Sequence, residues 1–127
     1  MDSRHDPSLS GLYHAISFQI AGIAVALLAN SANFALILFA DTNGHEIALC
    51  VPIIATALFT FVWGDATLQS QVANIKDAAV ETKNSHAYNF ISAQPYNLLR
   101  LMNLVLAFAL AASQLSILFG GYLVKVN

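Results

Sequence analysis

The sequence alternates long apolar runs with short polar segments, and three of the runs are long enough to cross a lipid bilayer. The first covers about residues 15–40, the second about 47–68 and the third about 101–124. An α-helix rises about 1.5 Å per residue, so about 20 residues cross a hydrocarbon core of about 30 Å. The pattern predicts an all-α membrane protein, in which residues 1–127 form a single domain with three transmembrane helices.

The segment between the second and third runs, about residues 69–97, is predicted to be largely helical. Residues 66–83 contain no Pro or Gly that would force the second helix to stop. Apolar residues recur there at spacings of four, three and four, which places them on one helical face: Leu68, Val72, Ile75 and Ala79. We expect the second helix to continue as a cytoplasmic amphipathic stalk whose apolar stripe contacts another subunit or a partner. The alternative is an amphipathic helix that lies on the lipid headgroups.

The distribution of positive charges predicts the orientation of the helices. Residues 41–46 form a polar, Gly-containing turn between the first two runs and contain no Lys or Arg. Four positive residues lie on the side of the N-terminus and of residues 69–97: Arg4, Lys76, Lys83 and Arg100. Only Lys125 lies on the other side. The positive-inside rule therefore places the N-terminus in the cytoplasm and the C-terminus outside.

The composition of the N-terminus bears on the kind of membrane. The N-terminus contains Asp2, Asp6 and a single Arg, which is not the composition of a transit peptide. A plasma (inner) membrane is therefore the default expectation. Trp63, Tyr88 and Tyr96 are expected near the cytoplasmic interface, where aromatic residues form belts.

Composition supports a lipid environment and excludes several classes of function. The chain is 57% hydrophobic and 9% charged, whereas soluble domains carry about 25% charged residues. A net charge of −2 without a basic patch gives no support for nucleic-acid binding. A single cysteine excludes an intrachain disulfide, and the four histidines avoid the middle of the three runs. We therefore expect no cofactor, no metal site and no enzymatic activity.

Small and polar residues form a continuous seam on the first and third predicted helices, and the second helix has a milder seam of Thr56, Thr60, Trp63 and Thr67. On the first helix the spacings are three, four, four and three, and on the third they are four and seven. The residues are Gln19, Gly22, Ala26, Asn30, Asn33, Asn103, Ala107 and Gln114. Lipid is as apolar as leucine, so close packing of small residues and interhelical hydrogen bonds drive association instead. An unpaired amide in hydrocarbon costs several kcal/mol, so these side chains should face protein or water.

Depth along the helices predicts two specific contacts. Asn30 and Gln114 both lie near the midpoints of helices that run in the same direction, so we expect them to hydrogen-bond to each other or across subunits. Asp65 lies about 11 Å from the midpoint of its helix, on the side where Arg100 begins the third helix. A salt bridge between them would offset the cost of burying either charge. Alternatively, Asp65 is a cation site at the mouth of a pore.

These features predict a small non-enzymatic integral membrane subunit. Its partners would be the lipid bilayer and either further copies of itself or other membrane subunits, met through the polar and small seams. The alternative is a homo-oligomeric ion channel whose pathway is lined by the same amides. The sequence contains no filter motif that would select one ion.

Overall fold

The computed structural model is helical over nearly all of the three predicted runs. It describes the backbone of residues 7–124 and the side chains of residues 14–120. The helices are α1 (Pro7–Phe39), α2 (Glu46–Asp77), α3 (Val80–Lys83), α4 (His86–Ser92) and α5 (Tyr96–Val124). Three segments are long and apolar enough to cross a membrane: His14–Phe39, Glu46–Asp77 and Tyr96–Gly120. The prediction of an all-helical chain with three such helices is confirmed.

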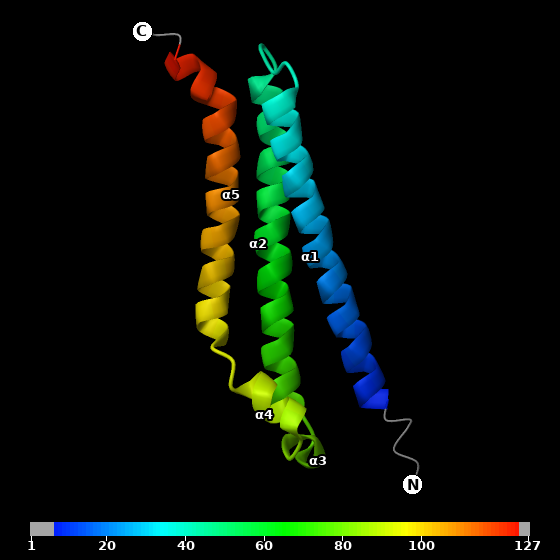
Figure 1. The fold of residues 1–127 in the computed structure, drawn as a ribbon. Coiled ribbons are helices and arrows are strands. Elements are labelled where there is room, and N and C mark those ends of the chain that lie inside the picture. Colours follow the sequence, from blue (N-terminus) through cyan, green and yellow to red (C-terminus); the bar gives the residue numbers. More distant parts are fainter. Residues whose placement is uncertain (1–6, 125–127) are drawn as a thin grey trace.

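The three long helices form a thin bundle around α2. In Figure 1, α2 lies between α1 and α5 and runs antiparallel to both. It packs against each of them, whereas α1 and α5 contact one another less extensively. The α1 axis lies close to α2 near their connecting loop and moves away from it toward the start of α1 (Figure 1). The short helices α3 and α4 lie at the end of the bundle where α1 begins.

Each long helix is longer than its predicted apolar run, and most of the added residues lie at one end. α2 continues to Asp77, as expected from the absence of Pro and Gly from residues 66–83. α5 begins at Tyr96 rather than near position 101, and the Leu99 backbone N–H donates to the Pro95 carbonyl at 3.0 Å. Two charges behind the predicted orientation, Arg4 and Lys125, lie outside the described residues.

The loop between α1 and α2 is a compact polar turn, as predicted. Gly44 has a φ of +80°, a region that side chains with a β-carbon rarely adopt. The Asp41 carboxylate accepts hydrogen bonds from the backbone and side-chain N–H groups of Asn43, at 3.2 and 2.7 Å. The Glu46 carboxylate accepts from the Gly44 backbone N–H at 3.2 Å, so the turn is held by its own side chains.

The apolar core lies toward the loop end of the bundle. It consists of Ile37, Ile53 and Leu118, one from each long helix, and all three are buried. Most other large apolar side chains of the helices point outward, among them Phe39, Ile47 and Phe108. A water-soluble bundle would bury this surface, so the outer faces are suited to lipid or to other membrane helices.

Candidate functional site

The centre of the bundle is a hydrogen-bonded amide pair that joins all three long helices. The side-chain amide N–H of Gln114 donates to the side-chain oxygen Oδ1 of Asn30 at 2.9 Å. Both residues are buried, with exposed fractions of 1% and 5%. The Asn30 amide donates in turn to the Ala26 carbonyl at 2.8 Å and to the Thr60 hydroxyl at 3.3 Å. The contact expected from depth therefore forms within one chain, and α2 contributes to it.

Further amides extend this contact along the α1–α2 interface. The Asn33 side-chain amide donates to the Thr56 hydroxyl at 3.2 Å. The Gln71 side-chain amide donates to the side-chain oxygen Oε1 of Gln19 at 2.8 Å. The Thr56 and Thr60 hydroxyls donate to carbonyls one turn earlier in α2, which leaves their oxygens free to accept. The seam of α1 thus meets polar partners on α2 along most of its length.

A close approach of the backbone of α1 to an aromatic ring lies within the same interface. A β-carbon on Gly22 would overlap the indole of Trp63, so only glycine fits there. The indole also stacks on Phe59 and contacts Phe18, with ring centroids 5.5 and 4.9 Å away. Trp63 Nε1 is buried, and no described residue accepts its hydrogen. The ring therefore acts through shape, filling the groove that glycine leaves in α1.

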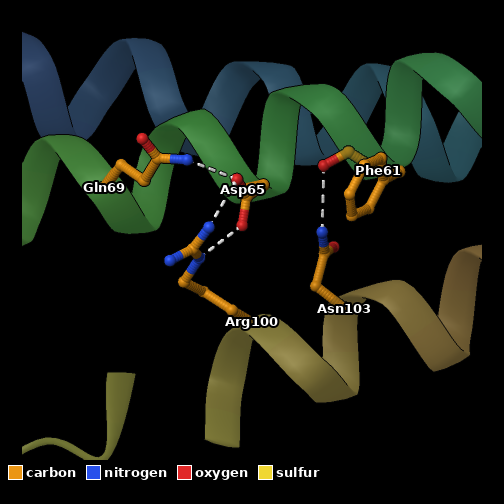
Figure 2. A network of polar contacts seen from close by, with 5 residues as sticks. All are labelled: Phe61, Asp65, Gln69, Arg100 and Asn103. Carbon is orange, nitrogen blue, oxygen red and sulfur yellow. Dashed lines mark hydrogen bonds and ion pairs between the residues drawn. The ribbon is translucent and has the colours of Figure 1, made fainter. Parts of the chain in front are cut away.

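The contact between α2 and α5 contains the predicted ion pair. Figure 2 shows Arg100 facing Asp65, with its Nε and Nη2 atoms at 2.5 and 3.1 Å from the two carboxylate oxygens. The Gln69 amide donates to the same carboxylate. One turn further along α5, the Asn103 amide donates to the Phe61 carbonyl at 3.0 Å (Figure 2). A β-carbon on Gly64 would overlap that amide, so a second glycine lets two helices approach closely.

Every predicted seam residue contacts a neighbouring helix or is buried beneath one. The two alanines of the seam, Ala26 and Ala107, are 7% and 4% exposed. The five amides donate to or accept from another helix. Thr56 and Thr60, from the milder seam predicted on the second helix, accept from Asn33 and Asn30. The partner that periodicity did not place on any seam is Gln71, which donates to Gln19. Depth and periodicity identify the polar face of α1, but they do not tell how the neighbouring helix α2 is rotated about its axis.

The predicted apolar stripe on α2 is only partly formed. Leu68, Val72 and Ile75 lie on the helix and are half-buried. Ala79 does not belong to this face, because α2 ends at Asp77 and the next residue is extended, with φ −61° and ψ 134°. No Pro or Gly marks this end in the sequence. α4 packs against this end of α2, so the chain itself covers part of the stripe assigned to a partner.

A second set of small residues, which the sequence reasoning missed, lies on the outer face of α5. We define this outer stripe as Ala109, Ala112, Ser113, Ser116 and Gly120. The first four are exposed, and a β-carbon on Gly120 would meet no atom within 4 Å. At about 100° per residue these positions lie within one narrow arc, which faces away from Gln114. Their spacings of three and four residues are the signal that could have identified them.

Among the described residues, no group of three or more His, Cys, Asp or Glu side chains could hold a metal ion. Comparisons with protein-family models, with curated proteins and with solved structures find no match to this chain. The function is therefore inferred from the contacts and surfaces of the chain alone.

Proposed function

We propose that the chain is a small non-enzymatic integral membrane subunit that associates, with further copies of itself or with other membrane subunits, through the outer stripe of α5. The supporting observation is the division of its small and polar residues between two faces of α5. One face is used inside the bundle, where Gln114 and Asn103 pair with α1 and α2. The other presents small residues outward. Small residues let helix backbones approach closely, which is how helices associate in lipid.

The internal contacts support a packing role for the amides. Asn30 uses its amide and its carbonyl oxygen within the chain, and Gln114 donates to it. Asn33 is likewise bonded to α2. An amide-lined pore remains the alternative function, but these side chains would have to leave their partners to line a pathway. Ion flux into liposomes that contain the wild-type chain tests this alternative.

Leucine substitutions in the outer stripe test the proposal. Ala109→Leu and Ser116→Leu would hold a neighbouring helix away from α5 without touching the inner seam. Self-association is measured by energy transfer between labelled copies in liposomes, and hetero-association by native mass spectrometry of the purified complex. The matched control is Ala24→Leu, which adds the same side chain to an exposed position of α1.

We expect both α5 variants to lose association and the α1 control to retain it. Association that survives in both α5 variants would overturn the proposal, as would a wild-type chain that remains a lone monomer in the membrane. Helical content, measured by circular dichroism, should be unchanged in all three variants, because each altered position faces away from the bundle.

We further propose that residues 69–97 lie in the cytoplasm, that the C-terminus lies outside and that the membrane is the plasma (inner) membrane. This is supported by Lys76, Lys83 and Arg100 at the α3–α4 end, and by the absence of Lys and Arg from residues 41–46. A reporter fused after Asn127 should be active only outside the cytoplasm. A cytoplasmic reporter signal would contradict this orientation.

A further inference from the structure

The helix α4 is fixed at two points by tyrosine hydroxyls. The Tyr88 hydroxyl donates to the Ile75 carbonyl of α2 at 3.5 Å. The Tyr96 hydroxyl, on the first residue of α5, donates to the Ile91 carbonyl at 2.9 Å. The start of α4 is capped by Ser85, whose hydroxyl oxygen accepts from the Tyr88 backbone N–H. The helix is therefore held against α2 and beside the first turn of α5.

This attachment determines which way Phe90 faces. Tyr88 and Phe90 are two residues apart, so they point about 200° away from each other around the helix. Because Tyr88 reaches α2, Phe90 lies on the face turned away from it. Its side chain is 71% exposed. A large aromatic residue is thus presented outward by a short helix that is otherwise rich in polar side chains.

The depth of Phe90 follows from the same contacts. In Figure 1, α4 lies just beyond the start of α5, and the Tyr96–Ile91 hydrogen bond holds its end there. Arg100 begins the next turn, about 6 Å further into the bundle. The Asp65–Arg100 pair belongs near the edge of the hydrocarbon core, since charges deeper in lipid are costly. The headgroup layer beyond that edge is about 5–8 Å thick, so the start of α5, which lies next to α4, falls within it.

We infer that α4 lies along the membrane surface and that Phe90 inserts into the lipid at the boundary between headgroups and acyl chains. The partner of this surface is the lipid bilayer itself. Phe90 extends the set of outward-facing apolar side chains that begins at Leu98 of α5. Aromatic side chains are favoured at this level of a membrane. The inference rests on the proposed function to the extent that the long helices must span the bilayer.

Apolar burial, rather than charge, drives this contact. The charged residues next to α4 in sequence are two lysines and two acids: Lys76, Asp77, Glu81 and Lys83. Their formal charges cancel, so attraction to anionic lipid is weak. Insertion of Phe90 should therefore occur in vesicles of zwitterionic phosphatidylcholine, and added anionic lipid should change it little.

A nitroxide label can measure the depth directly. Cys50→Ser removes the chain's one cysteine, and Phe90→Cys then gives a single labelling position. A second variant, Phe108→Cys, reports the membrane-spanning part of α5, where Phe108 is 75% exposed. A third, Lys83→Cys, reports α3. Each labelled chain is reconstituted in phosphatidylcholine vesicles, and collision with oxygen, which dissolves in lipid, is compared with collision with a water-soluble nickel chelate.

We expect the ratio of oxygen to nickel collision to rise severalfold from position 83 to position 90, and further at position 108. A label at position 90 that collides with nickel as readily as the label at position 83 would overturn the inference while position 108 still reports a spanning helix. A label at position 90 shielded from both reagents would mean that protein covers this surface, which also overturns it. A label at position 108 in water would instead refute the proposed membrane-spanning function.

Discussion

The indole ring of Trp63 lies in the space that a β-carbon on Gly22 would occupy. This contact limits how closely α1 and α2 approach, and the ring also packs against Phe18 and Phe59. It also explains why the polar pairs on either side of it form. A wider separation of the helices would stretch the Asn30–Thr60 and Gln19–Gln71 contacts together.

Gly22→Ala should therefore destabilise the α1–α2 pair. Overpacking of this kind typically costs about 1–3 kcal/mol, which outweighs the gain in helix propensity from replacing glycine. The free energy of unfolding, measured by denaturant titration in detergent micelles, checks this. Gly120→Ala is the matched control, because its new β-carbon would meet open space, and it should leave stability unchanged or slightly raised. Equal effects at the two glycines would contradict the packing argument.

Gly64→Ala should also be destabilising, and its effect should depend on Asn103. The new β-carbon would displace the amide that donates to the Phe61 carbonyl. Asn103→Ala alone loses one interhelical hydrogen bond, worth about 0.6 kcal/mol on average in membrane bundles. The double variant should be more stable than the sum of the two single effects predicts, because the overlap disappears. A double-mutant cycle of unfolding free energies measures the coupling, and strict additivity would refute it.

Replacing both residues of the central amide pair, Asn30 and Gln114, should destabilise the bundle less than replacing Asn30 alone. Asn30→Leu leaves Gln114 buried without its acceptor, and an unsatisfied buried polar group costs about 1–3 kcal/mol. The variant with both residues replaced by Leu leaves neither amide unsatisfied. It should unfold at a higher denaturant concentration than Asn30→Leu alone. The reverse order would show that the pair is not coupled.

The Asp65–Arg100 pair should contribute modestly, and its contribution should decrease with salt. The Arg100 side chain is 43% exposed and that of Asp65 is 17% exposed, so solvent screens the interaction. Exposed ion pairs are typically worth about 0–1 kcal/mol. A double-mutant cycle with Asp65→Asn and Arg100→Gln, repeated at low and high ionic strength, should give a coupling energy that falls as salt increases. A coupling that is large and independent of salt would indicate a fully buried pair.

Sequence reasoning identified the helices and the inner face of α1 because both depend on local periodicity. Asn30 and Gln114 could be paired because each lies near the middle of its helix, and depth alone then brings them together. Asp65 and Arg100 were paired for the same reason at the edge of the bundle. On α2, periodicity also identified the milder seam that contains Thr56 and Thr60, but it did not identify Gln71, which lies beyond the predicted apolar run. The role of Gln71 depends on how α2 is rotated between its neighbours.

The position at which α2 ends could not be predicted from the sequence either, for a different reason. Nothing in the local sequence forces the helix to stop at Asp77, and Ala78 and Ala79 are good helix formers. The stop accompanies the return of the chain along α2 through α4, which the Tyr88–Ile75 hydrogen bond holds in place. Local periodicity cannot predict tertiary contacts of this kind. Because α2 ends at Asp77, Ala79 does not lie on the predicted stripe.

The bonding of Asn30 has a consequence for the order in which the chain assembles during its synthesis. Its amide hydrogens are held by Ala26 and Thr60, so both bonds can form as soon as the first two long helices have entered the membrane. Its carbonyl oxygen then faces the side from which α5 arrives, and Gln114 donates to it. The first two helices thus form a hairpin that presents a ready acceptor to the third. We expect α5 supplied as a separate fragment to bind this hairpin, and to bind up to about threefold more weakly when Thr60 is replaced by Val, because one such bond is worth about 0.6 kcal/mol.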